Sequence, residues 1–152
     1  MTKYEQQLSK EEFNFIYSKV PRLTVEIIVK NKDGRIYLTK RATEPCRGQW
    51  HLPGGTVRFG ELMIKAVQRI AKRELGINVT KAKNVGYIEY PSHFENGLDS
   101  PVGIVFEVEA YSSTINPNRE ALDGDWFIKV PEGMHADQDT YLLSNHYLNL
   151  AE

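Results

Sequence analysis

The chain has 152 residues, of which 41% are hydrophobic and 26% are charged, and its formal net charge is −1. These values are ordinary for a globular protein with its own core, so we expect one domain over residues 1–152. There is no basic excess of the kind that binding to nucleic-acid phosphates requires, so we expect no nucleic-acid partner. No apolar run approaches the roughly 20 residues that span a bilayer, and nothing resembles a signal peptide. With Cys46 as its single cysteine, the chain fits a reducing compartment, and we expect a cytoplasmic protein without a membrane partner.

The N-terminal part of the chain predicts a helix and then a hairpin. Ser9 suits a helix cap, and apolar residues recur at helical spacing after it, which predicts a helix over residues 9–19. Residues 23–29 and 35–39 predict two strands, and the turn signal at 31–34 joins them as a hairpin.

The middle of the chain predicts irregular segments around one long helix. Residues 41–49 predict a loop, and a short apolar segment at 50–52 follows it. The Pro-Gly-Gly sequence at 53–55 predicts a turn. Residues 61–75 return to helical spacing, and Gly76 stands where helices favour a left-handed residue.

The C-terminal part predicts strands at residues 83–90, 102–110 and 125–130, and a final helix over 138–150. Strands mixed with helices, together with an early hairpin, indicate an α/β domain with a mixed sheet.

The stretch most informative about chemistry is residues 54–77. Its glycine pair lets the backbone approach a ligand closely, and the carbonyl of Gly55 offers a hard oxygen ligand. Glu61 lies near the predicted helix start and Glu74 near its end. Mg²⁺ prefers such oxygen ligands together with substrate phosphates, and it neutralises the charge that develops when a diphosphate leaves. The stretch therefore predicts a divalent metal site at these three residues.

The spacing of this stretch resembles the signature of the Nudix hydrolase family. That signature runs glycine, five residues, glutamate, seven residues, and then Arg-Glu-x-x-Glu-Glu-x-Gly with an aliphatic residue. The residues in register with it are Gly55, Glu61, Arg69, Glu74, Gly76 and Ile77. The resemblance implies a Nudix-type α/β/α sandwich with a mixed sheet, and metal-dependent hydrolysis of a nucleoside diphosphate linked to another group.

Two positions depart from the signature, because Ile70 and Arg73 stand where the family usually has glutamate. Positions 70, 73 and 74 share one helix face, where three carboxylates would repel each other unless several cations were bound. Keeping only Glu74 predicts a single ion, Mg²⁺ or Mn²⁺. Arg73 is then free either to contact a phosphate or to pair with a neighbouring carboxylate.

This reduced motif is similar to that of the GDP-mannose mannosyl hydrolase branch, which keeps the last glutamate and works with one metal. The similarity covers roughly residues 10–145. It implies a small-molecule nucleotide substrate, preferably a nucleotide sugar resembling GDP-mannose, and a homodimer. It also implies that Glu26 stands at an acidic position of that branch and Arg41 at its phosphate-contacting arginine.

One loop departs from the branch, which uses a histidine base ahead of a strand tryptophan. Matched on Trp126, the base position falls near Ala121, and alanine cannot deprotonate water. Glu120 or Asp123 is a candidate substitute, or the water attacks phosphorus as in most of the family. Two further candidate bases lie in predicted loops, at His93 and His135, whereas His146 is expected to be structural within the last helix.

The branch's second arginine is replaced by Thr56 here, and Arg58 is the candidate that compensates. The expected catalytic residues are Glu74, Arg41, Glu120 and Asp123. The expected substrate-binding residues are Glu26, Arg41, Arg58, Arg73 and His93.

Two alternatives to nucleotide-sugar hydrolysis stay open. One is general nucleotide pyrophosphatase action at phosphorus. The other is a degenerate domain that binds a nucleotide without cleaving it, because two motif carboxylates and the loop histidine are missing. The sequence leaves the base, the sugar, the atom attacked and the oligomeric state undetermined.

Overall fold

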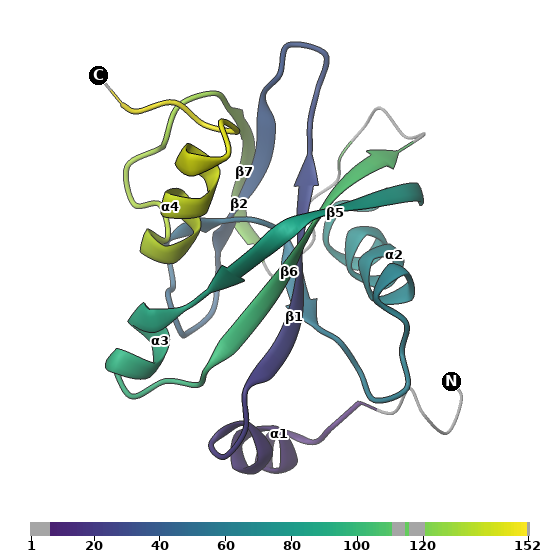
Figure 1. Cartoon of the computed structure of the whole chain (residues 1–152), viewed down its shortest axis with the longest axis vertical. Coiled ribbons are helices and arrows are strands. Elements are labelled where there is room, and N and C mark those ends of the chain that lie inside the picture. Colours follow the sequence, from purple (N-terminus) through teal and green to yellow (C-terminus); the bar gives the residue numbers. More distant parts are fainter. Residues whose placement is uncertain (1–6, 111–114, 116–120, 152) are drawn as a thin grey trace.

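The structure is a computed structural model, and it describes residues 7–110, 115 and 121–151 (Figure 1). The elements in chain order are α1 (Lys10–Tyr17), β1 (Arg22–Val29), β2 (Ile36–Arg41), β3 (Trp50–His51), β4 (Gly54–Thr56), α2 (Met63–Leu75), β5 (Val79–Glu89), α3 (Pro91–Glu95), β6 (Pro101–Ala110), β7 (Ala121–Phe127) and α4 (Ala136–Ser144).

The strands form two sheets. The larger has the order β4-β1-β6-β5, in which β1 and β6 are parallel while β4 and β5 are antiparallel to their neighbours. The smaller has the order β3-β2-β7 and is antiparallel. The prediction of an α/β fold with a mixed sheet is therefore confirmed.

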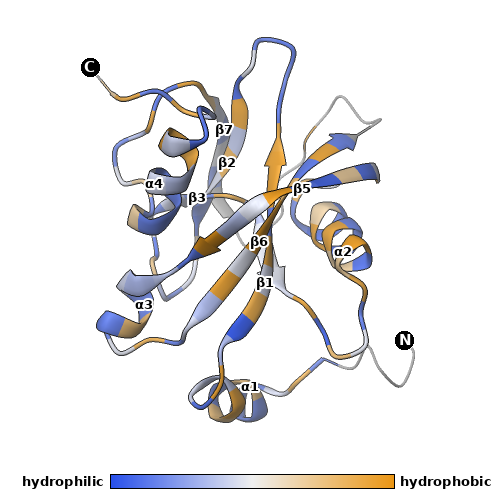
Figure 2. Ribbon diagram, viewed as in Figure 1, coloured by the Kyte–Doolittle hydropathy of each residue, from blue (hydrophilic) through white to orange (hydrophobic). Residues whose placement is uncertain are grey.

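The core lies on both faces of β1, since every residue from Thr24 to its end is buried. Val25 and Ile27 point into a cluster with Ile70 of α2. Ile28 points the other way, into a cluster with Leu142 of α4. Figure 1 shows α2 and α4 on opposite sides of this sheet, and Figure 2 shows hydrophobic residues gathered along β1 and on part of α2. This is the α/β/α layering that the family resemblance implies.

The predicted hairpin is wrong in one respect, because β1 and β2 leave their turn into different sheets. The turn itself is present: the Asn31 amide N–H donates to the Arg35 carbonyl at 2.9 Å. Only a single bridge, between Lys30 and Ile36, continues from it. One edge of β1 pairs with β6 from Arg22 to Val29, and the other pairs with β4 from Thr24 to Glu26, so β2 does not pair along β1.

The glycine turn predicted at residues 53–55 is also partly wrong. Residues Gly54–Thr56 form the strand β4, paired with the segment of β1 that runs from Thr24 to Glu26. Short glycine strands are disfavoured by backbone entropy, but here close approach to β1 requires them. This pairing brings the motif glycines directly beside Glu26.

Helix ends follow their local chemistry. Ser9 and Glu12 form a capping box at α1, and α2 ends at Gly76 with φ of 68°. Helix α2 begins two residues later than predicted, so Glu61 lies in the preceding loop. Helix α4 ends at Ser144, and His146 beyond it has φ of 61°, so the prediction of His146 within the helix is wrong.

The short helix α3 was not predicted, and it moves His93 from an expected loop into a helix. Across the described ranges, none of the helices combines the length and the apolar composition needed to cross a membrane.

Candidate active site

A cavity of about 1110 Å³ opens between the motif strand β4, helices α1 and α2, the loop at residues 42–49, and the start of α4. The predicted site residues on its wall are Glu26, Arg41, Gly55, Arg58, Arg73, Glu74 and His93. The fold thus brings together acids and arginines that are widely separated in the sequence.

Two predicted residues are not on this wall, and a third lies outside the described residues. Asp123 is exposed on β7, where it pairs in register with Lys40, and it does not line the cavity. Glu61 lies behind the wall in the loop before α2. Glu120 falls outside the described residues.

Glu74 lies at the C-terminal end of α2, facing the motif glycines. Its Oε2 accepts a hydrogen bond from the Gly54 amide at 3.3 Å, and its Oε1 lies 3.2 Å from Nη2 of Arg73. The Glu74 side chain is only 15% exposed. Of the two roles left open for Arg73, its position beside a carboxylate is therefore the one seen here.

Ile70 explains why the reduced motif still packs. It is fully buried, and a Cβ placed on Gly55 would lie 3.0 Å from its Cδ1. A side chain that contacts the core in this way replaces a carboxylate with apolar packing, and so it removes one ligand position without leaving a void.

Glu26 occupies a niche in the middle of the sheet. Its Oε1 accepts hydrogen bonds from the Thr24 hydroxyl at 2.8 Å and from the Tyr90 hydroxyl at 2.9 Å. Glycines flank it on both neighbouring strands: a Cβ on Gly103 would lie 2.8 Å from the carboxylate, and one on Gly54 would overlap it. The niche therefore exists only because both neighbours lack a side chain.

The pKa of Glu26 is raised from 4.5 to about 7. Burial is the main cause, and the nearby charge of Glu74 raises it further, while the bonds from Thr24 and Tyr90 lower it. The two carboxyl groups thus disfavour each other's charge, which a cation between them would relieve.

Tyr90 and Gln138 connect Glu26 to α4, and neither was singled out for this role from the sequence. Gln138 Nε2 donates to the Tyr90 hydroxyl at 2.9 Å, and Gln138 Oε1 accepts from the Leu52 amide at 2.7 Å. Tyr90 is only 4% exposed, so its ring packs in the core while its hydroxyl takes part in this network. A lone tyrosine at a strand end carries no sequence signal for such a network.

Glu61 supports the motif through a two-point ion pair. Its Oε2 accepts from Arg69 Nε at 2.8 Å and its Oε1 from Arg69 Nη2 at 2.9 Å. The Arg58 amide donates to the same Oε1, and Arg69 Nη2 also reaches the Thr56 carbonyl. The bonds from Arg69 are the largest cause of the lowered pKa of Glu61. These contacts fasten the loop between β4 and α2.

We expect Arg69→Ala to lower the free energy of unfolding by about 2 kcal/mol, because it leaves a shielded carboxylate without its charged hydrogen-bond donor. Glu61→Ala should cost a similar amount, and the double variant little more than either single one, because the pair acts as a unit. Urea unfolding measures all three. Additive losses would show that the two side chains act independently. A much larger loss of activity in Glu61→Ala than in Arg69→Ala would indicate that Glu61 binds the metal directly.

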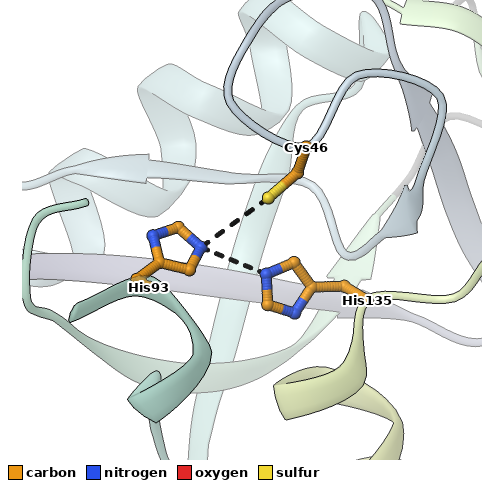
Figure 3. A group of neighbouring side chains, drawn as sticks. All are labelled: Cys46, His93 and His135. Carbon is orange, nitrogen blue, oxygen red and sulfur yellow. Dashed lines mark hydrogen bonds between the residues drawn. The ribbon is translucent and has the colours of Figure 1, made fainter. Parts of the chain in front are cut away.

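Two histidines meet at the far wall of the cavity. His93 Nε2 lies 3.1 Å from His135 Nε2, and both side chains are buried (Figure 3). His93 Nδ1 lies 3.2 Å from Asp99 Oδ1, and Asp99 in turn pairs with Arg22. Burial raises the pKa of Asp99, but the bonds from His93 and Arg22 outweigh it and bring the pKa to about 2. Burial lowers the pKa of His135, and the neighbouring His93 lowers it further.

The fold and cavity define an α/β domain with an acid- and arginine-lined cavity, and comparison with known proteins specifies the family. The family model described as the NUDIX domain matches residues 20–139. The chain therefore belongs to the Nudix hydrolase family.

Three relatives illustrate its position in the family. The chain is 30% identical to the low-salt glycan biosynthesis protein Agl8 of Haloferax volcanii, over 90% of this chain and 89% of that protein. It is 32% identical to an ADP-ribose pyrophosphatase of Methanocaldococcus jannaschii, over 70% of this chain and 62% of that protein, which is less than two thirds of the latter. The crystal structure of a MutT NUDIX hydrolase from Burkholderia pseudomallei matches with a TM-score of 0.73 at 28% identity, covering 82% of this chain and 97% of that chain.

Hydrolases of this family generally use divalent metal ions such as Mg²⁺ or Mn²⁺. The residues present fit such an ion, because the carboxylate of Glu74 faces the cavity beside the motif glycines and the carboxyl group of Glu26 lines the same cavity. Carboxylate oxygens are also the ligands that hard cations prefer.

Proposed function

We propose that this protein hydrolyses a nucleoside diphosphate linked to another group, with a nucleotide sugar resembling GDP-mannose as the preferred substrate. The observation that carries the proposal is the position of Glu74. It is the one carboxylate retained among positions 70, 73 and 74 of the motif, and it faces the motif glycines on the wall of a cavity that also contains arginines.

Glu74 and the carbonyl of Gly55 are the groups we assign to holding one Mg²⁺ or Mn²⁺ ion, with Glu61 supporting them through Arg69. When bound, such an ion neutralises charge on the diphosphate as it leaves. Arg73 lies against Glu74 at 3.2 Å, so it limits the negative charge at this point and favours one ion over several.

Arg41 and Arg58 supply the positive charge for the phosphates. Both line the cavity, and Arg41 is held by the loop after β2, where its Nε donates to the Thr43 carbonyl at 3.0 Å. A guanidinium presents several donors in a fixed plane, which suits two neighbouring phosphate groups. His93 also lines the cavity and is proposed to contact the remainder of the substrate.

Glu26 is the group in this cavity best suited to exchange a proton near neutral pH. Its pKa of about 7 matches that task, because a general base works best when its pKa is close to the operating pH. Asp123 does not line the cavity, so we do not assign the base to it.

The relatives support two related substrates. Agl8 is named for glycan biosynthesis, and its match covers nearly all of both chains, which favours a nucleotide sugar. The pyrophosphatase match favours ADP-ribose, a second nucleoside diphosphate derivative, as the alternative. We also propose a homodimer, for which the exposed apolar residues Phe15, Ile16 and Val20 in and after α1 offer a contact surface.

A panel of nucleotide sugars, ADP-ribose and nucleoside triphosphates, assayed with Mg²⁺ or Mn²⁺, tests the proposal through its products. Attack at the sugar carbon releases free sugar and a nucleoside diphosphate, whereas attack at phosphorus releases a sugar phosphate and a monophosphate. We expect hydrolysis of a nucleotide sugar that stops when EDTA is added. Tight nucleotide binding with no metal-stimulated hydrolysis of any compound would instead identify a binding domain.

A further inference from the structure

A second group of potential metal ligands lies on the cavity wall, and the proposed function makes no use of it as a group. Cys46 comes from the loop at residues 42–49, His93 from α3, and His135 from the N-terminal cap of α4. Figure 3 shows the three side chains pointing toward one another. One ligand atom from each lies within 4.8 Å of the other two.

The separations suit a small tetrahedral ion. Cys46 Sγ lies 4.0 Å from His93 Nε2, and the two Nε2 atoms are 3.1 Å apart. Sulfur and nitrogen ligands at normal Zn²⁺ bond lengths are about 3.3–3.6 Å from each other. The third pair, Cys46 Sγ and a ring nitrogen of His135, lies within 4.8 Å, so shifts of up to about 1 Å in these side chains bring all three onto one ion.

We propose that Cys46, His93 and His135 bind one Zn²⁺ ion at a site separate from the ion at Glu74. Thiolate and imidazole ligands select Zn²⁺ over Mg²⁺, whereas the carboxylate and carbonyl oxygens at Glu74 select the harder ion. The two sites share one cavity but differ in ligand chemistry.

The surroundings of His93 already match those of a zinc ligand. A metal-binding histidine usually donates its second ring N–H to a carboxylate, which fixes the tautomer and strengthens the ligand. His93 Nδ1 lies 3.2 Å from Asp99 Oδ1, and Arg22 holds that carboxylate from the other side. The lone pair of His93 Nε2 is thereby directed toward Cys46 and His135.

Binding of the ion requires the ring proton of His135 to change its position, because that proton occupies the nitrogen that would bind the ion. Its Nδ1 accepts a hydrogen bond from the Asp137 amide at 3.2 Å, so in the metal-free protein its proton is on Nε2, facing His93. Binding moves that proton to Nδ1 and breaks the bond from Asp137, while Cys46 releases its thiol proton to solvent. The hydrogen bond between the two Nε2 atoms and the cap bond from Asp137 are lost, and three metal–ligand bonds are formed.

All three residues line the cavity, so the fourth position on the ion faces the space where the substrate binds. Three protein ligands and one open position are typical of zinc sites that bind water or a ligand oxygen. We therefore expect the site to accept an oxygen atom of a bound molecule in addition to the ion.

Zinc binding to the whole purified protein, measured by equilibrium dialysis in excess Mg²⁺, tests the proposal. The excess Mg²⁺ occupies oxygen sites such as Glu74 and leaves the sulfur and nitrogen site to Zn²⁺. We expect one Zn²⁺ per chain in the wild type. Cys46→Ser and His135→Asn should each weaken binding by more than roughly 100-fold, because loss of a mere supporting residue already weakens a metal site by about 10–100-fold. Asparagine at 135 can still cap α4.

His146→Asn is the matched control, since this exposed histidine lies outside the cluster and asparagine tolerates its positive φ. Co²⁺ provides a second readout, because a cobalt–thiolate bond adds a near-ultraviolet absorption that Cys46→Ser should abolish. Thermal unfolding verifies that each variant is folded. Unchanged Zn²⁺ stoichiometry and affinity in Cys46→Ser and His135→Asn would overturn the proposal, as would the absence of binding by the wild type.

Discussion

Replacing Glu74 by glutamine is expected to reduce kcat by roughly 10²–10³-fold while leaving the protein folded. Removing a ligand charge from a metal that stabilises a leaving diphosphate costs several kcal/mol, and each 1.4 kcal/mol is about tenfold in rate. Glutamine keeps an oxygen that can accept the hydrogen bond from the Gly54 amide. Steady-state kinetics at saturating metal, together with thermal unfolding, measure the two effects separately.

Glu89→Gln is a suitable control, because Glu89 is exposed on β5 and does not line the cavity. It should have the activity of the wild type. Full activity in Glu74→Gln would refute the assignment of the metal to this carboxylate. A large loss of thermal stability would instead point to a structural role for Glu74.

Glu26→Gln is expected to remove a pH dependence of stability. The folded-state pKa of Glu26 is raised from 4.5 to about 7. The stability contributed by its protonated form is therefore complete below pH 4.5, and it is lost as the pH rises through about 7. Glutamine stays uncharged and can accept the same bonds from Thr24 and Tyr90. Relative to the wild type, the variant should gain about 2–3 kcal/mol of stability between pH 5 and pH 8.

Urea unfolding at both pH values measures this difference, in the presence of EDTA because a cation near Glu74 would stabilise the charged form of Glu26. Glu109→Gln is the control, since Glu109 is exposed on β6. It should follow the wild type at both pH values. A constant difference between Glu26→Gln and the wild type from pH 5 to pH 8 would show that Glu26 ionises normally in the folded protein.

The elements of this fold were largely predictable, but the pairing of its strands was not. Capping at Ser9 and the left-handed Gly76 fixed two helix ends from local sequence alone. The separation of β1 from β2 depends on competition for the edges of β1. The competing strands come from residues 54–56 and 101–108. A local hairpin signal contains no information about those distant competitors.

The site shows the same division between local and distant information. Fixed spacing assigned Gly55, Glu61 and Glu74 to one metal site, and in the structure Glu74 faces the motif glycines while Glu61 pairs with Arg69. The niche around Glu26 requires Gly103 from β6 and Tyr90 from the N-terminal cap of α3, and no spacing rule connects these residues. The meeting of Cys46, His93 and His135 depends on three separate segments, so it too could not be predicted from the sequence.

The parallel pairing of β1 with β6 also bears on how the protein reaches its active form. These strands are far apart along the chain, so joining them closes a long loop, and such contacts are entropically costly and slow to form. Until β6 is in place, Gly103 does not cover Glu26, and this carboxyl group stays hydrated with an ordinary acidity. We expect the recovery of activity during refolding to lag behind the formation of α2, because the helix depends on local contacts and the cavity depends on the long-range pairing of β1 with β6.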